Sequence, residues 1–166
     1  MSINENADVI LLTPEGFNRL TAEFEHLTTE RRPEIAERLR DSKDHGEFSD
    51  DNSELDEVKF EQAMVEGRIV DLKSVLLNAQ VLTPDDVSNR EVTIGTIAEI
   101  VNTKMKKKRK VTLVSSVEAD PANELISVES PLGEALIGNK KGDKVTVDAP
   151  AGKIVWEIRA LSKGVK

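Results

Sequence analysis

The stretch LDEVKFEQAMVEGRIVDLKSVL, residues 55–76, decides the fold of this chain. Its core-facing positions follow alternating steps of three and four residues, which is the spacing of a coiled-coil seam. These positions are Leu55, Val58, Gln62, Val65, Ile69, Leu72 and Leu76. Only Gln62 among them is polar. The sequence therefore predicts a long helix here whose apolar stripe packs against a second helix.

The second helix is predicted upstream of this seam. Thr13 and Pro14 supply an N-cap and a first helical residue, and apolar residues then recur at three- and four-residue steps over 17–27. Pro33 interrupts the run, because proline has no N–H to donate and clashes with the preceding turn. We expect a kink or a short break there. The helix is expected to end near Gly46, since glycine can adopt the left-handed backbone of a helix C-cap.

Acidic residues gather between the two helices. There are eight of them against the single Lys43: Asp41, Asp44, Glu47, Asp50, Asp51, Glu54, Asp56 and Glu57. Because only a few residues join the helices, the helices must run antiparallel as a hairpin, and thirty residues at about 1.5 Å each reach roughly 45 Å. The acids therefore lie at the far tip. From the residue types alone they are best explained as solvated groups that favour the start of the second helix through its dipole.

Strand-like periodicity replaces helical periodicity in the second half of the chain. Five strands are predicted, at 92–101, 110–116, 125–129, 144–148 and 153–161. Ser130 and Pro131 open a short helix that Gly138 closes. The predicted fold class is α+β, with an N-terminal antiparallel coiled-coil hairpin and a C-terminal antiparallel sheet domain that carries one short helix.

Turn residues and composition changes set the expected domain boundaries. The expected segments are a flexible N-terminus at 1–12, the hairpin at 13–77 with its acidic tip at 46–54, a linker at 78–91 and the sheet domain at 92–166.

The composition excludes several classes of site. The chain has no cysteine, so it contains no disulfide framework and no thiolate metal site. A net charge of −8 argues against wrapping nucleic acid with a uniformly basic surface. The apolar runs are too short for a membrane span and no signal-peptide pattern is present, so we expect a cytoplasmic protein.

One basic run stands apart from this acidic average. Residues 104–110 read KMKKKRK. Lysines near a β-hairpin turn are often only a soluble sheet edge, whereas a cluster of cations can also bind phosphate or an acidic protein surface. Both interpretations stay open at this point.

Three separated stretches carry a resemblance to a known family. They are RRPEIAERLRDSKDHGEF (31–48), VEGRIVDLKSVLLNAQVL (65–82) and SPLGEALIGNKKGDKVTVDAPAGKIVWEI (130–158). Together and in this order they resemble the GreA/GreB transcript cleavage factors. The resemblance implies that the sheet domain is similar to FK506-binding proteins and grips the rim of the secondary channel of bacterial RNA polymerase. The hairpin would pass down that channel.

The implied function is that of a transcription elongation factor. Such a factor stimulates cleavage of the 3′ end of backtracked nascent RNA and so rescues arrested complexes. It is a cofactor of the polymerase's own cleavage activity rather than an enzyme. The expected partners are RNA polymerase, the nascent RNA and DNA within the elongation complex, and we expect a monomer when the protein is free.

The resemblance also gives the tip acids a role. Polymerases use two magnesium ions, one of which needs further oxygen ligands. Asp50 or Asp51, together with Glu47, would supply them and orient a water for attack on the phosphodiester. The tip here is one residue longer than the family pattern: alignment from Gly46 puts Asp50 in the place of the family's Glu, and alignment from Asn52 puts Asp51 there. We expect no metal or cofactor beyond that magnesium.

The remaining implied site residues flank the tip or lie in the sheet domain. Lys43 and Lys59 match basic positions that the family uses near RNA. The polymerase-binding loop would consist of Glu129, Ser130, Pro131 and Leu132. As a strand-to-helix turn, these four residues also have a purely structural explanation.

Two other functions are considered. The extra tip residue and the short Asp side chains could distort the ligand set, which would make the chain a secondary-channel regulator that inhibits polymerase without promoting cleavage. A peptidyl-prolyl isomerase or chaperone is more remote, because isomerase sites usually need an aromatic-lined pocket and the sheet domain offers only Trp156.

Overall fold

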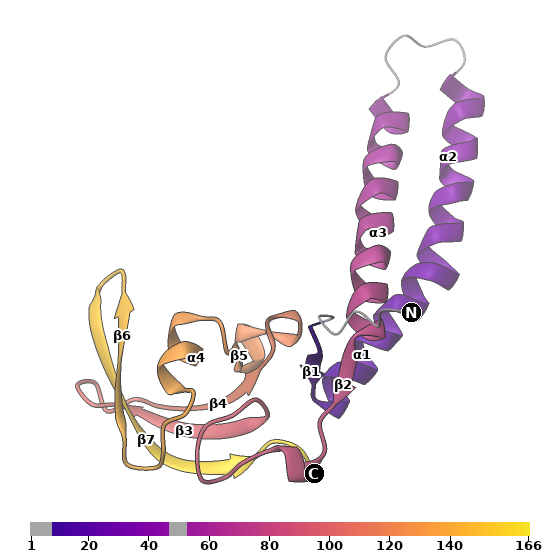
Figure 1. Cartoon of the computed structure of the whole chain (residues 1–166). Coiled ribbons are helices and arrows are strands. Elements are labelled where there is room, and N and C mark those ends of the chain that lie inside the picture. Colours follow the sequence, from indigo (N-terminus) through magenta and orange to yellow (C-terminus); the bar gives the residue numbers. More distant parts are fainter. Residues whose placement is uncertain (1–7, 47–52) are drawn as a thin grey trace. The chain divides into compact units, whose positions relative to one another are not determined.

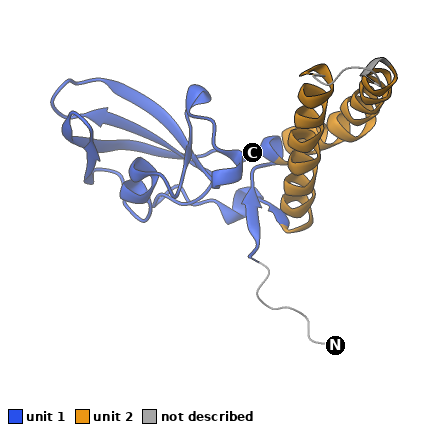
Figure 2. Cartoon of the chain, turned by 90° about the horizontal axis from the view of Figure 1, so that it is seen from above, with its two compact units in different colours: residues 1–16, 79–166 blue, residues 17–78 orange. Residues whose placement is uncertain are grey.

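The computed structural model describes residues 8–46 and 53–166 of the chain. These residues form two compact units, which Figure 2 shows in different colours. One unit is residues 17–78. The other combines residues from both ends of the chain, 1–16 and 79–166.

The first unit is the predicted helical hairpin. Its elements are α1 (Pro14–His26), a π-helical turn (Leu27–Arg31), α2 (Arg32–Gly46) and α3 (Ser53–Leu77), of which α1 begins in the other unit. Helices α2 and α3 lie beside each other (Figure 1). At a rise of about 1.5 Å per residue, the 25 residues of α3 measure roughly 37 Å.

The predicted coiled-coil seam is confirmed. Every seam position of α3 is buried or half-buried, and Val58, Ile69 and Leu72 are at most 5% exposed. On the other arm of the hairpin, Leu20 of α1 and Ile35 of α2 are 3% and 1% exposed. A narrow stripe of apolar side chains therefore holds the hairpin together along its length.

The break predicted at Pro33 is also confirmed, and it takes the form of the π-helical turn. Within this turn the N–H of Arg32 donates to the carbonyl of Leu27 five residues earlier. The hydroxyl of Thr29 donates to the carbonyl of Glu25 at 2.6 Å. Because Pro33 cannot donate to the carbonyl four residues before it, the helix widens over the preceding turn.

The second unit contains a five-stranded sheet with the order β5-β4-β3-β7-β6. Its strands are β3 (Thr96–Asn102), β4 (Lys108–Val114), β5 (Leu125–Ser127), β6 (Lys144–Ala149) and β7 (Gly152–Lys163). Three of the pairings are antiparallel, as predicted, but β4 and β5 pair in parallel. The purely antiparallel sheet was therefore a wrong prediction. The connection between β4 and β5 holds two short 3-10 helices, Ser116–Glu118 and Pro121–Asn123. This connection carries the chain back along β4, so that β5 pairs with β4 in the same direction.

The core of this unit lies between one face of the sheet and helix α4 (Pro131–Leu136) (Figure 1). Its fully buried members include Ala98, Ile100, Leu113, Leu136 and Ile158. Ser130 caps α4, and Gly138 has the left-handed φ of 80° expected of a helix-closing glycine.

A short parallel pair of strands was not predicted. Strand β1 (Ile10–Leu12) pairs with β2 (Ala79–Val81), and a 3-10 helix (Pro84–Asp86) follows. These two strands lie within the segments that were expected to be a flexible N-terminus (1–12) and a linker (78–91). Three-residue strands show too little alternation to be read from sequence, and this pair depends on contacts far apart in the chain.

Among the described residues, no helix has the length and apolar character that a membrane crossing requires.

Candidate functional site

The acidic tip is framed by two described helix ends. The acids on α2 and α3 next to the tip are exposed: Asp41, Asp44, Glu54, Asp56 and Glu57. The implied magnesium ligands Glu47, Asp50 and Asp51 lie outside the described residues. Within the described ranges, 8–46 and 53–166, no group of three or more acids and histidines is placed to hold a metal ion.

The two basic residues assigned to the tip region, Lys43 and Lys59, lie on different helices of the hairpin. Lys43 is exposed on the last turns of α2, and Lys59 is exposed on the second turn of α3. Their sequence neighbours Ser42 and Val58 are buried, at 3% and 1% exposure. The seam therefore continues close to the tip, while the charged side chains on both helices stay in solvent.

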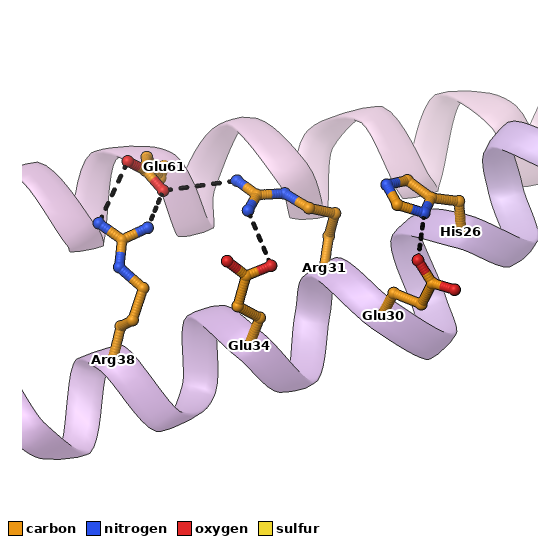
Figure 3. Close-up of polar contacts among 6 residues, drawn as sticks. All are labelled: His26, Glu30, Arg31, Glu34, Arg38 and Glu61. Carbon is orange, nitrogen blue, oxygen red and sulfur yellow. Dashed lines mark hydrogen bonds and ion pairs between the residues drawn. The ribbon is translucent and has the colours of Figure 1, made fainter.

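Ion pairs between the helices brace the hairpin behind its tip (Figure 3). Arg38 donates two hydrogen bonds to the Glu61 carboxylate, at 2.6 and 3.4 Å. Arg31 reaches the same carboxylate at 3.5 Å and also contacts Glu34 at 3.1 Å. The hydrogen bond from Arg38 is the main cause that holds the pKa of Glu61 below its ordinary value.

Two further bidentate pairs lie nearer the base of the hairpin. Arg32 binds Glu66 at 2.8 and 2.9 Å, and Arg68 binds Glu23 at 2.7 and 2.9 Å. The hydrogen bond from Arg68 lowers the pKa of Glu23. None of these ion pairs was predicted from the sequence. The signal was present, since Glu61, Glu66 and Arg68 each adjoin a seam position, where coiled coils place interhelical ion pairs.

The loop assigned to polymerase binding is a rigid turn at the start of α4. The Ser130 hydroxyl donates to the carbonyl of Ser127 at 2.6 Å and accepts from the N–H of Gly133 at 3.1 Å. A Cβ on Gly133 would lie 1.9 Å from the Ser127 carbonyl oxygen, so no larger residue fits there. The tight turn explains the Ser-Pro-Leu-Gly order of residues 130–133 in local structural terms.

This turn presents different faces to solvent and to the core. Glu129 and Pro131 are exposed, whereas Leu132 packs against the core of the sheet. The Glu129 carboxylate accepts a hydrogen bond from the Ser116 hydroxyl, which itself contacts the hydroxyl of Ser127 at 2.9 Å. The structure therefore brings the four predicted residues together, with Glu129 held in place by serines of two other segments.

A shallow apolar groove lies close to this turn. It has a volume of about 580 Å³ and is lined by residues of the segment 91–94 together with Val128, Glu134 and Ile137. Ile137 is 38% exposed. Exposed apolar surface next to a rigid charged turn is the usual make-up of a protein-binding site.

Trp156 does not line an open pocket. It is 7% exposed and belongs to the buried core, and the Arg109 guanidinium lies 5.7 Å from its ring centre. Arg109 is held there by Glu124 at 2.6 Å. The tryptophan that an aromatic-lined isomerase pocket would need therefore lies in the buried core of the sheet unit.

Comparisons with known proteins cover both units. Residues 10–81 match the family model described as transcription elongation factor, N-terminal, and residues 87–163 match transcription elongation factor, GreA/GreB, C-term.

Curated relatives match over almost the whole chain. Transcription elongation factor GreA of Thermoanaerobacter pseudethanolicus is 42% identical over 154 residues, which is 93% of this chain and 98% of the relative. GreA of Acetivibrio thermocellus is also 42% identical, over 93% of this chain and 96% of the relative. Among solved structures, GreA factor homolog 1 of Thermus thermophilus is 31% identical, covers 93% of this chain and 99% of that chain, and has a TM-score of 0.42.

Two family models that together span most of the chain, with full-length relatives at this identity, establish that the chain belongs to the GreA/GreB family of transcription elongation factors.

Proposed function

We propose that the chain binds bacterial RNA polymerase, places its hairpin in the secondary channel and stimulates cleavage of the 3′ end of backtracked nascent RNA. The observation that carries the proposal is the hairpin. Its two helices are joined by a narrow seam and by ion pairs, and exposed acids flank residues 47–52 on both sides. This design suits a rod that delivers carboxylates to a remote site.

The chemistry would belong to the polymerase. Its catalytic centre holds one magnesium ion firmly, and a second ion needs added oxygen ligands before it can position a water for attack on a phosphodiester. Asp50 or Asp51 with Glu47 would supply those ligands, and Lys43 and Lys59 would lie near the RNA. The chain would then act as a cofactor of cleavage with no metal of its own.

The globular unit would provide the grip on polymerase. The turn at Glu129 and Pro131 is exposed and rigid, and the apolar groove beside it offers surface for a protein partner. Glu129→Lys should weaken binding to purified RNA polymerase by about tenfold, a loss of about 1.4 kcal/mol. Asp148→Lys makes the same charge change at an exposed position of β6 and should leave binding unchanged. Equal losses in the two variants would argue against this docking turn.

Transcript cleavage tests the main proposal. The purified protein is added to stalled, backtracked elongation complexes with magnesium, and the release of 3′ RNA fragments is followed on gels. Fragments should form faster than with polymerase alone, and Glu47→Ala, Asp50→Ala and Asp51→Ala should rank the acids. Asp56→Ala removes an exposed acid of α3 as a matched control. If the protein releases no fragments beyond the polymerase background, the proposal fails.

Inhibition without cleavage is the second candidate, and the longer tip favours it. The extra residue between Gly46 and Asn52 and the short Asp side chains change where carboxylates lie, and catalytic geometry is sensitive to shifts of about 1 Å. An inhibitor would slow nucleotide addition in the same assay and release no RNA fragment.

A further inference from the structure

The sheet carries a second groove on the face opposite its core. This groove has a volume of about 790 Å³ and lies over strands β3, β4 and β7. Five of the residues that line it are cations. Arg109 is held by Glu124 at 2.6 Å, and the other four are Lys106, Lys108, Lys110 and Arg159. Most of the cations of the basic run 104–110, for which two interpretations stayed open, line this groove.

The strand register fixes which face these cations occupy. Ala98 and Ile100 point into the core at 0% exposure, so their neighbours Glu99 and Val101 point to the other face. Lys110 lies opposite Glu99 and Lys108 lies opposite Val101. The lysines of β4 therefore project from the face that α4 does not cover.

Two unusual backbone features add the remaining cations. Lys106 has a left-handed φ of 58°, a conformation that non-glycine residues rarely adopt. The turn around it is fixed by Asn102, whose side-chain oxygen accepts the N–H groups of Lys104 and Met105 at 3.0 and 3.1 Å. A lysine therefore occupies a turn position whose left-handed backbone conformation costs glycine less free energy.

Arg159 enters the groove through a β-bulge. Between β3 and β7, Glu99 pairs with Ala160 and Ile100 pairs with Ile158, so Arg159 is the extra residue on its strand. Bulges re-aim a side chain and are often found at functional sites. Its contact with Glu157 is 3.5 Å long, and that of Lys110 with Glu99 is 3.9 Å. Both pairs are exposed enough for the cations to exchange partners.

We propose that this groove binds the phosphate backbone of a nucleic acid without reading its sequence. Successive outward side chains on a strand are about 6.6 Å apart, so Lys108 and Lys110 can contact different phosphate groups of one strand. None of the described residues that line the groove is aromatic, and Trp156 lies in the core, so base stacking would not contribute. Binding would therefore be electrostatic and strongly dependent on salt.

A protein partner fits this surface less well. Protein interfaces are depleted in lysine, and their strongest contacts come from tryptophan, tyrosine and arginine in dry pockets. Here lysines dominate and the exposed large apolar side chain nearby is Met105 on the turn. The docking turn beside α4 lies on the other face of the sheet, so that both surfaces of the unit can be occupied together.

Fluorescence anisotropy with the full-length protein and no polymerase tests this inference. The probes are a labelled 20-nucleotide single-stranded RNA and a 20-base-pair DNA duplex, titrated between 30 and 200 mM KCl. The test variant is Lys106→Gln/Lys108→Gln/Arg159→Gln. The matched control is Lys140→Gln/Lys141→Gln/Lys144→Gln, which removes three exposed cations from the loop and start of β6.

The expected result is binding at low salt that weakens steeply as salt rises, with a log–log slope of about three from four phosphate contacts. The test variant should bind at least tenfold more weakly, and the magnitude of its log–log slope should fall by about two. The affinity of the control variant should change less than twofold. The probe that binds more tightly identifies RNA or DNA as the source of the phosphates.

Three results would overturn the inference: no binding of either probe at 30 mM KCl, equal losses in the two triple variants, or displacement by polyglutamate as effective as by unlabelled nucleic acid of equal charge. Because polymerase is absent, these results are independent of the cleavage assay. A failure of either proposal can therefore be told from a failure of the other.

Discussion

The helical unit and the globular unit differ in how they bury apolar side chains and in the charge they carry. The hairpin buries a single stripe and leaves charged side chains on its other faces, whereas the sheet unit buries a cluster that reaches from Val92 to Ile158. Residues 1–78 contain nine basic and nineteen acidic residues, and residues 79–166 contain fourteen and twelve. The acidic excess of the whole chain therefore comes from the hairpin half, and the other half is slightly basic.

In both units the buried residues that stabilise the fold are distinct from the exposed charged residues. The described contacts that stabilise the hairpin are its apolar seam and its interhelical ion pairs. In the sheet unit the core lies on one face, and the exposed groups on the other face and at the α4 turn are free to bind partners.

The largest effect is expected in the core of the sheet unit. Leu113 is fully buried at 0% exposure, so Leu113→Ala should reduce the free energy of unfolding by about 2–5 kcal/mol. Urea denaturation followed by Trp156 fluorescence reports on this unit. Met105→Ala, at a residue of the same unit that is 74% exposed, should change stability by less than about 0.5 kcal/mol. If the two variants lose similar stability, burial in the core does not govern the stability of this unit.

A smaller effect is expected where α1 begins. Glu118 is buried at 2% exposure, and its carboxylate accepts the N–H of Thr13 at 3.0 Å and the Thr13 hydroxyl. A Cβ on Gly16 would lie 2.2 Å from the Glu118 side-chain carbon. Gly16→Ala must therefore displace this carboxylate, and it should cost about 1–3 kcal/mol of stability in thermal unfolding.

Gly67 provides the matched control for that change. It lies within α3, and a Cβ there would meet nothing within 4 Å. Gly67→Ala should raise stability by about 0.5–1 kcal/mol, because alanine loses less backbone entropy in a helix. Stabilisation by both glycine replacements would show that the carboxylate moves aside at little cost.

The hairpin and the sheet unit also differ in how much of their structure could be predicted from the sequence. The hairpin was predictable, because its seam depends on spacing within 22 residues and the break depends on Pro33 alone. The turn at Ser130 and Pro131 was predictable for the same local reason. The parallel pairing of β4 with β5 and the contact between Thr13 and Glu118 were not, since the latter joins residues 105 positions apart. The groove needs a bulge and a left-handed lysine, which no local pattern announces.

The smallest effect concerns the ion pairs of the hairpin and depends on pH. The pKa of Glu61 is lowered mainly by the hydrogen bond from Arg38, so the charged form is favoured in the folded state. The stabilisation is then complete above the ordinary glutamate pKa of about 4.3 and is lost as the pH falls through the lowered pKa.

Circular dichroism melting curves at pH 7 and at acid pH measure this dependence. Glu61→Gln should lower the melting temperature at pH 7 and should lose less stability than the unmodified chain on acidification. Glu37→Gln, at an exposed residue of α2 outside the described ion pairs, should keep the full dependence. An unchanged pH profile in Glu61→Gln would mean that the pair between Arg38 and Glu61 adds nothing to stability, so that the seam and the pairs Arg32–Glu66 and Arg68–Glu23 hold the hairpin without it.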